Sequence, residues 1–391
     1  MHVNQRYTAT YSRDNLMIEP AQFLNILKNE GVTFYTGVPD SLLKNLINAF
    51  SDLVPERDHV ISVNEGSAVA IAIGKGLATN EVPVVYLQNS GLGNIVNPIV
   101  SLASDTVYGV PILLIIGWRG EPGTADEPQH QRQGDVTLPM LDAIGVPYQV
   151  LEQSYKKAES QIKELLEVSR DKKCPVALVV RKNTFSEYPT ITRPNRYSLS
   201  RESVIHTIVQ CAEKRSVFVA STGMIGRELY ELRRLKFESH NSDFLTVGGM
   251  GHASQIALGI AREHPERSVF CLDGDGAALM HLGSMALIGQ SSQSNLHHIV
   301  LNNGSHASVG GQPTVAFEVC LSSIALGCGY ATAERITTAK ALEKNIIESR
   351  NLDGVSFVDI RISNFQRDDV GRPFETPQEN KLSLQNFLNI K

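Results

Sequence analysis

The residues with the clearest chemical potential stand at the ends of two predicted strands in the second half of the chain. Residues 268–273 run into Gly274-Asp275-Gly276, and residues 297–301 run into Asn302-Asn303, with 25 residues (277–301) between the two motifs. Glycines let a backbone approach a phosphate at a helix N-terminus, where free N–H groups favour anions. Asp275 would repel that phosphate unless a cation lay between them, and Mg²⁺ prefers such hard oxygen ligands. The alternative is an ordinary strand-to-helix turn with an unrelated Asn-Asn turn.

Glu65 is the corresponding residue of the first half. It opens an otherwise apolar predicted helix in VNEGSAVAIAIG, residues 63–74. One interpretation is a carboxylate that the helix dipole satisfies. The other is a general acid or base in an apolar setting.

A nicotinamide-binding site is the competing interpretation of the glycines that follow the predicted strand 243–248. Gly249-x-Gly251 begins the required pattern, but Ser254 holds the position of the third glycine. The dinucleotide fingerprint is therefore incomplete, and the pattern favours another ligand.

The elements that position these residues alternate between strands and helices. Strands are predicted at 33–38, 59–63, 82–87, 111–117 and 175–180, and again at 216–222, 243–248, 268–274, 297–303 and 355–362. Helical patterns lie between them, for example at 21–31, 65–78 and 202–214. This rhythm predicts two doubly wound α/β domains with parallel sheets.

The domain boundaries follow from changes in this pattern. Residues 183–199 contain two prolines and no periodicity, which indicates a linker. We expect a disordered lead-in at 1–16 with Met17 as a candidate start, a first domain at 17–182, a second at 200–375 and a C-terminal tail at 376–391.

Composition excludes several classes of protein. The 391 residues carry a net charge of −5, whereas a nucleic-acid binder needs a basic face. The five cysteines form no CxxC pair, which predicts neither a zinc site nor a disulfide framework. No stretch approaches the length of a membrane span, and the N-terminus lacks the apolar region of a signal peptide. We therefore expect a cytoplasmic protein.

The GDG motif, its gap and the Asn pair together resemble the signature of thiamine diphosphate enzymes. The resemblance implies a magnesium ion held by the Asp275 carboxylate, the Asn303 side-chain oxygen and the Ser305 carbonyl. It also implies that Glu65 bonds N1′ of the cofactor's aminopyrimidine and assists catalysis. It further implies two turns that bind the diphosphate: one comprises Gly274, Asp275, Gly276 and Ala277, and the other Thr222 and Gly223. The Gly248 carbonyl would accept a hydrogen bond from the cofactor's 4′-amino group, and Met250 would support the bent cofactor.

The same resemblance bears on assembly. In this family the pyrimidine and the diphosphate bind different domains, normally on different subunits. Glu65 of one chain would then serve Asp275 of another, so we expect a homodimer or a higher oligomer with active sites at the interface.

Longer segments narrow the resemblance to the phosphonopyruvate decarboxylases, over about residues 17–365. The segments are GVPDSLLK (37–44), VNEGSAVAIAIG (63–74), YLQNSGLGNIVNP (86–98), GWRGEPG (117–123), DEPQHQRQG (126–134), GGMGHASQIALGIA (248–261) and NNGSHASVGGQPT (302–314). The layout without a middle domain is also similar.

This resemblance implies decarboxylation of 3-phosphonopyruvate to phosphonoacetaldehyde and CO2. Sulfopyruvate decarboxylase is the alternative, and another 2-oxo acid decarboxylase or a carboligase stays open. A catalytically silent cofactor-binding module is the reading from a different class. The intact set of Glu65, Asp275 and Asn303 argues against it.

A substrate with two acidic groups needs cations and amide donors around it. We expect these at the carboxyl ends of parallel strands, where α/β proteins bind ligands. Asp40 resembles the aspartate that decarboxylases of this superfamily keep near the reacting carbon, so we expect it to be catalytic. The expected substrate contacts are Asn89, Ser90, Asn94, Arg119, His130 and His306.

Overall fold

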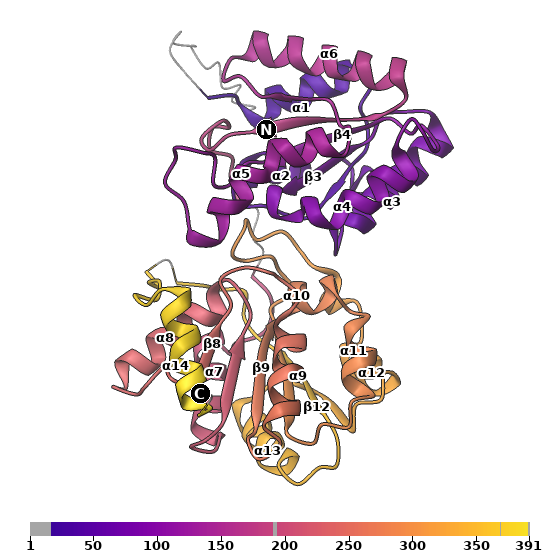
Figure 1. Ribbon diagram of the computed structural model, residues 1–391. Coiled ribbons are helices and arrows are strands. Elements are labelled where there is room, and N and C mark those ends of the chain that lie inside the picture. Colours follow the sequence, from indigo (N-terminus) through magenta and orange to yellow (C-terminus); the bar gives the residue numbers. More distant parts are fainter. Residues whose placement is uncertain (1–16, 191–193, 368, 390–391) are drawn as a thin grey trace, which may run out of the picture. The chain divides into compact units, whose positions relative to one another are not determined.

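The computed structural model describes residues 17–190, 194–367 and 369–389, and it divides the chain into two compact units (Figure 1). One unit runs to Val60 and continues over Ala68–Pro189; the other holds Ile61–Ser67 and the chain from Thr190 onward. The predicted lead-in at 1–16 lies outside the described residues. Each unit is a six-stranded sheet covered by helices, which confirms the predicted fold class.

The sheet of the first unit has the strand order β2-β1-β3-β4-β6-β5. Strand pairs β1–β3, β3–β4, β4–β6 and β5–β6 run parallel. The sequence pattern did not predict β5, which is a three-residue, half-buried edge strand. The strands are β1 (Tyr35–Gly37), β2 (His59–Ile61), β3 (Val84–Gln88), β4 (Ile112–Gly117), β5 (Tyr148–Val150) and β6 (Pro175–Val180).

Helices cover both faces of this sheet because alternate strand residues point to opposite sides. Val84 and Tyr86 join one apolar core with α1, α2 and α6, whereas Val85 and Leu87 join another with α3, α4 and α5. The helices are α1 (Pro20–Asn29), α2 (Lys44–Leu53), α3 (Glu65–Thr79), α4 (Leu92–Pro98), α5 (Pro128–Ala143) and α6 (Tyr155–Lys172), with short turns η1 (Glu56–Asp58), η2 (Asn89–Gly91) and η3 (Ile99–Ala103).

The sheet of the second unit repeats the topology of the first. Its strand order is β11-β12-β10-β9-β7-β8. Starting from β8, the strands follow one another in the same pattern as those of the first sheet starting from β2. Chain order therefore reverses between β7 and β9, and such a switch point is where open α/β sheets bind ligands. The strands are β7 (Val217–Ala220), β8 (Asp243–Leu245), β9 (Val269–Gly274), β10 (Leu296–Asn302), β11 (Thr332–Ile336, not predicted) and β12 (Ser356–Arg361).

Two apolar cores also flank this second sheet. Helices α9, α11, α12 and α14 pack on one face, and α7, α8 and α13 pack on the other. The helices are α7 (Arg201–Cys211), α8 (Met224–Leu235), α9 (Ala253–Glu263), α10 (Asp275–Met280), α11 (Ser284–Gly289), α12 (Leu321–Gly327), α13 (Ala339–Ser349) and α14 (Pro377–Phe387), with the short turn η4 (Val315–Phe317).

The predicted C-terminal tail instead contains helix α14. Thr376 and Glu379 form a capping box around Pro377 at its first turn, which satisfies N–H groups that would otherwise lack partners. Leu384 is buried in the core of the second unit, and the Asn380 side chain bonds both Leu245 N and Asp243 O of β8. The segment is therefore part of this domain.

None of the helices among the described residues has the length and apolar character that crossing a membrane requires.

Candidate functional site

The carboxyl ends of β8, β7, β9 and β10 gather most of the predicted cofactor residues within the second unit. Because these parallel strands are neighbours, the loops that follow them meet at one edge of the sheet. The Thr222 hydroxyl, after β7, donates to the Val247 carbonyl after β8 (3.0 Å). The sheet thus brings together loops from distant parts of the sequence.

Asp275 opens helix α10 at this edge and is 3% exposed. Thr314 Oγ1 donates to its Oδ2 at 2.5 Å. Burial nevertheless raises the pKa of Asp275 to about 6, because its charge is removed from water. The ionised carboxylate is therefore one that a bound cation would stabilise.

The turn after β10 presents further oxygen ligands. Asn303 is buried, and its Oδ1 accepts the N–H of Ser305 at 3.0 Å, which fixes the amide and leaves a second lone pair. The Gly304 carbonyl accepts the N–H of Thr314 (3.0 Å). Thr314 therefore ties this turn to Asp275, with which it also bonds.

These groups fit a magnesium ion. A carboxylate, an amide oxygen and a backbone carbonyl are the hard donors that Mg²⁺ prefers. Asp275, Asn303 and Ser305 supply them from two loops that Thr314 holds together. The predicted ligands thus belong to one local arrangement.

Two glycine turns flank the predicted metal site. Gly223 begins helix α8 with φ +99°, a conformation that other residues rarely adopt. Gly274 precedes α10, and a Cβ on it would lie 3.7 Å from Ile225 in the first turn of α8. The two predicted diphosphate turns therefore stand side by side at the switch point between β7 and β9.

Three buried side chains support the Gly274 turn from inside the domain. Asp273 Oδ1 accepts the N–H of Gly274 (2.9 Å), and its Oδ2 faces His298 Nε2 at 3.4 Å. His298 Nδ1 lies 3.1 Å from the Tyr330 hydroxyl. Side-chain atoms of Cys271, Asp273 and His298 that could ligate a metal also lie within 4.8 Å of one another. The lack of a CxxC pair in the sequence did not reveal this cluster. We interpret Asp273, His298 and Tyr330 as polar residues that stabilise the Gly274 turn.

Met250 and His306 converge on Gly276. A Cβ on Gly276 would lie 2.9 Å from the His306 ring and 3.3 Å from Met250 Cε, so only glycine fits there without displacing them. Burial lowers the pKa of His306 to about 4, which keeps its ring neutral at pH 7. Gly248 lies in the same bend after β8. The structure thus brings together the predicted pyrimidine supports and the predicted diphosphate turn.

Glu65 is the first residue of helix α3 and is 6% exposed. Asn64 Oδ1 accepts the N–H groups of Gly66 (2.8 Å) and Ser67 (3.4 Å), and so caps this helix. Asn64 therefore caps the helix, and Glu65 stands in its first turn, where the helix dipole also favours a carboxylate.

Asp40 lies beyond β1 in the first unit, where it is fully buried. It accepts the Gln88 side chain at 2.6 Å and the N–H of Leu43 at 3.2 Å. Burial raises its pKa, while the Gln88 bond and the nearby Arg119 charge oppose that effect. The strand ends of β1 and β3 therefore carry a carboxyl group that retains a proton more readily than an exposed aspartate.

Arg119, after β4, is already paired. Its Nε and Nη2 bond the two oxygens of Asp126 at 2.8 and 2.5 Å, and its Nη1 donates to Ser41 at 2.9 Å. This pairing holds the pKa of Asp126 at about 2. Arg119 is thus a rigid cation next to Asp40, and Asp126 offsets its charge.

Asn89 has a structural role that the sequence did not predict. Its side chain is fully buried, donates to the Arg119 carbonyl (2.8 Å) and to Thr137 (2.9 Å), and accepts the Arg119 N–H (3.2 Å). Both ends of the amide are therefore occupied within the domain. We correct the expected substrate contact at Asn89 to a support for Arg119.

The remaining predicted substrate residues are spread around this edge. Ser90 is exposed and donates to Gln88 (2.8 Å), and Asn94 is exposed on α4. His130 lies in the first turn of α5; burial and the Arg119 charge lower its pKa, although Asp126 opposes this. Its buried Nδ1 makes no hydrogen bond to the described residues.

Several contacts that organise these sites are not predicted by the sequence pattern. Gln88, Asp126 and Thr314 each bond a predicted site residue directly. All three stand within or beside the segments quoted for the resemblance, but their partners are up to 48 residues away. Spacing along the chain carries no signal for such pairs.

Comparisons with known proteins agree with this geometry. The family model "Thiamine pyrophosphate enzyme, N-terminal TPP binding domain" matches residues 21–140, and its C-terminal TPP binding domain counterpart matches residues 221–360. Thiamine pyrophosphate is another name for thiamine diphosphate. Apart from Ile61–Ser67, the first matched region lies in the first unit, and the second lies in the second unit.

Full-length relatives point the same way. A phosphonopyruvate decarboxylase of Streptomyces viridochromogenes is 32% identical over 380 residues, covering 93% of this chain and 93% of that protein. One from Streptomyces hygroscopicus is 30% identical over 380 residues (93% and 92%). A sulfopyruvate decarboxylase of Methanosarcina acetivorans is 25% identical over 393 residues (94% and 97%). The chain therefore belongs to the thiamine pyrophosphate enzymes, as a phosphonopyruvate decarboxylase-like member of that family.

Proposed function

We propose that this protein is a thiamine diphosphate- and magnesium-dependent decarboxylase that converts 3-phosphonopyruvate to phosphonoacetaldehyde and CO2. The observation that carries the proposal is the buried Asp275 carboxylate at the glycine turn, which Thr314 ties to the Asn303–Ser305 turn. Two relatives of 30–32% identity that bear the name phosphonopyruvate decarboxylase support the substrate.

The second unit holds the cofactor in this proposal. Asp275, Asn303 and Ser305 would hold magnesium, and the Gly223 and Gly274 turns would hold the diphosphate of the cofactor. The other proposed cofactor contacts are Thr222, Gly248, Met250, Gly276 and Ala277. The bound cofactor supplies an electron sink for the pair left behind when CO2 departs.

Glu65 exchanges a proton with the pyrimidine end of the cofactor. Its buried place at the start of an apolar helix supports this role, and the capping N–H groups are bound by Asn64. Proton transfer by a positioned carboxylate is the usual form of such catalysis.

Asp40 manages the proton at the carbon that loses CO2. A buried carboxyl with a raised pKa holds a proton closer to neutral pH than an exposed one. It can therefore protonate the former carbonyl carbon, which yields the aldehyde.

Arg119 provides the cation for the distal phosphonate. Asp126 holds one edge of the guanidinium, and the Nη1 edge lies at Ser41, beside Asp40. Asp126 offsets part of the Arg119 charge, so the substrate needs further partners. The other proposed substrate contacts are His130, His306, Ser90 and Asn94.

The proposed assembly is a homodimer or a higher oligomer, with Glu65 of one copy serving Asp275 of another. Helix α3 supports this, because its exposed residues include Ile71 (39% exposed) and Leu77 (71%). Beyond Glu65, its only charged residue is Lys75. A helix that is apolar around most of its surface normally packs against another element.

Sulfopyruvate is the second candidate substrate. A sulfopyruvate decarboxylase is similar to this chain over nearly its whole length, at 25% identity. A sulfonate resembles a phosphonate in size but carries one charge fewer at full ionisation. A pocket with an offset arginine could accept either.

The test is CO2 release from phosphonopyruvate, sulfopyruvate and pyruvate, measured side by side with thiamine diphosphate and Mg²⁺. The proposal predicts the highest kcat/KM for phosphonopyruvate and no turnover after removal of the cofactor. A higher kcat/KM for sulfopyruvate would transfer the assignment to that substrate. If none of the three substrates released CO2, the proposed decarboxylase activity would be rejected.

A further inference from the structure

Arg361 ends strand β12 and is the largest fully buried side chain of the described residues, at 1% exposure. A buried guanidinium is costly unless it is paired and hydrogen-bonded. Its Nη2 lies 2.9 Å from Oδ2 of Asp359, which is fully buried two residues earlier on the same face of the strand. The pair forms a buried polar centre within the second unit.

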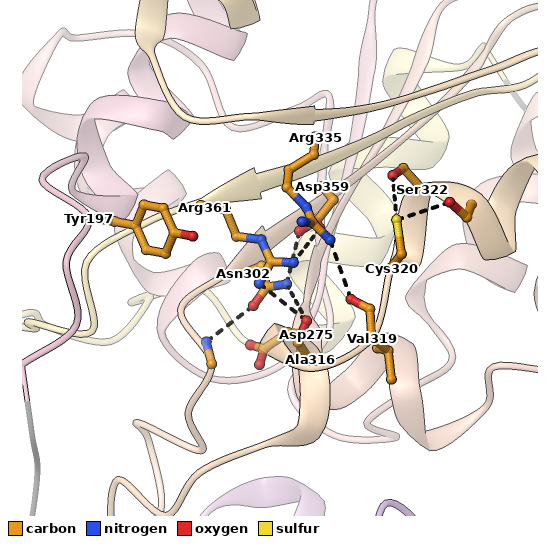
Figure 2. Close-up of polar contacts among 12 residues, drawn as sticks. Tyr197, Asp275, Asn302, Ala316, Val319, Cys320, Ser322, Arg335, Asp359 and Arg361 are labelled. Carbon is orange, nitrogen blue, oxygen red and sulfur yellow. Dashed lines mark hydrogen bonds and ion pairs between the residues drawn. The ribbon is translucent and has the colours of Figure 1, made fainter.

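Asp359 collects partners from three adjacent strands (Figure 2). Asn302 Nδ2 on β10 donates to its Oδ1 at 2.9 Å, and Arg335 on β11 approaches its Oδ2 at 3.4 Å. Asn302 stands opposite Arg361 in the β10–β12 register. The carboxylate therefore fixes the first residue of the Asn-Asn motif, which the proposed metal does not use.

Arg361 also contacts the loop that follows β10. Its Nη1 donates to the Ala316 carbonyl at 3.2 Å, an oxygen that also lies 3.4 Å from Asn302 Nδ2. Its guanidinium stands 4.7 Å above the ring of Phe317, a cation–π contact. The Phe317 ring in turn fills the space that a side chain on Gly304 would need. The guanidinium therefore contacts the Ala316–Phe317 end of this loop directly, and the Phe317 ring passes the contact on to the Gly304 end.

These contacts continue directly to the proposed metal ligands. While Asn302 Nδ2 bonds Asp359, its Oδ1 accepts the N–H of Gly304 at 3.2 Å. The Gly304 carbonyl accepts from Thr314 N, and the Thr314 hydroxyl donates to Asp275. A displacement at Arg361 would thus shift ligands on both sides of the metal position.

We propose that Arg361 is a positioning residue for the magnesium site: with Asp359 and Asn302, it holds the loop that presents Asn303, Ser305 and Thr314. The inference rests on the proposed function, because it assumes that magnesium binds at Asp275. Lysine cannot replace this arginine, because a point charge cannot bond Asp359 and Ala316 while stacking on Phe317.

The experiment measures Mg²⁺ affinity rather than turnover. Mg²⁺ is titrated calorimetrically into the full chain at saturating thiamine diphosphate, for wild type, Arg361→Lys and Arg361→Met. Outer residues that orient metal ligands typically contribute about 10- to 100-fold in affinity. We expect the Mg²⁺ Kd of both variants to rise by that factor, and excess Mg²⁺ to restore cofactor binding.

Arg335→Gln is the matched control. Arg335 contacts the same carboxylate, but its side chain is 42% exposed and its other bond goes to the Val319 carbonyl. Its removal should leave the Mg²⁺ Kd unchanged. If Arg361→Met does not fold, Arg361→Lys and Phe317→Leu decide. Phe317→Leu removes the ring that stacks on Arg361 and packs on Gly304, and it should weaken Mg²⁺ binding in the same direction.

Two results would overturn the inference. One is a wild-type Mg²⁺ Kd in Arg361→Lys with intact circular dichroism. The other is a loss of cofactor binding that excess Mg²⁺ does not restore, which marks a purely structural residue. A wild-type chain without Mg²⁺-dependent cofactor binding would instead reject the proposed site itself, so the two failures are distinguishable.

Discussion

Arg119 and Asp126 form a two-point ion pair, with Nε–Oδ2 and Nη2–Oδ1 distances of 2.8 and 2.5 Å. The pair holds a cation rigidly beside the buried Asp40. If Arg119 also contacts the phosphonate, Arg119→Ala leaves that anion without a charge-assisted partner. The loss typically costs about 2–5 kcal/mol, or roughly 30- to 5,000-fold in kcat/KM.

Kinetics on two substrates isolate this effect. Pyruvate lacks the distal anion, so its turnover should change far less, and the preference for phosphonopyruvate should narrow. Arg181→Ala is the control, because Arg181 forms a more exposed ion pair with Glu121 in the same unit. An unchanged substrate ratio in Arg119→Ala would make Arg119 structural and move the search to His130 and Asn94.

Glu65→Gln should bind the cofactor but lose proton exchange at its C2 atom by orders of magnitude. A neutral amide cannot exchange the proton that a carboxylate does. Deuterium exchange at C2, followed by NMR, measures this without any substrate. Glu81→Gln, at a surface glutamate just beyond helix α3, should leave the rate unchanged. An unaltered rate in Glu65→Gln would refute the assigned role.

Asn89→Ala should destabilise the protein rather than alter substrate binding alone. The substitution leaves the Arg119 carbonyl and Thr137 without the amide they share. An unsatisfied buried polar group costs about 1–3 kcal/mol. Urea unfolding compares this variant with Ser90→Ala, which removes an exposed hydroxyl. A wild-type free energy of unfolding together with a raised KM would return Asn89 to the substrate pocket.

His297 makes the stability of the second unit sensitive to acid. Burial lowers its pKa to about 4 from the ordinary 6.5, and the nearby Arg350 charge adds to this. As pH falls below 6.5 the unfolded chain binds the proton first, so stability is complete above that pH and is lost toward pH 4. Between pH 7 and 4.5 the loss is about 2–3 kcal/mol from this residue.

Urea unfolding at the two pH values checks the titration of His297. His297→Gln cannot titrate, so its free energy of unfolding should fall by that much less than the wild-type value over the same range. Equal falls in both proteins would show that His297 is already protonated in the folded state or accessible to water.

The parallel α/β architecture could be predicted from the sequence because buried central strands are continuous apolar runs. Strand β6 (175–180) matched its prediction to the residue. Edge strands carry a weaker pattern: in β11 only Ile336 is buried, and the other four residues are half-buried or exposed, so the strand was missed. Helix α14 was taken for a tail because only Leu384 of its residues is buried.

The residues of the candidate site also divide into those that the sequence could predict and those that it could not. Gly274, Asp275 and Asn303 could be proposed from the sequence because backbone conformation and ligand chemistry restrict their residue types. Asn89 could not be assigned correctly, since its partner Thr137 lies 48 residues away and no spacing rule connects them. The Arg361–Asp359 centre was missed because its link to Asn302 depends on strand register, here β10 against β12.

The central claim is that Asp275 anchors thiamine diphosphate through magnesium. Calorimetric titration of thiamine diphosphate with and without Mg²⁺, into wild type and Asp275→Ala, tests it most directly. Asp353→Ala, at an exposed loop of the same unit, is the control. The account predicts that Mg²⁺ strengthens cofactor binding in wild type and in Asp353→Ala, and that Asp275→Ala loses this gain because the diphosphate has lost its cation bridge. Wild-type, Mg²⁺-dependent affinity in Asp275→Ala would contradict it.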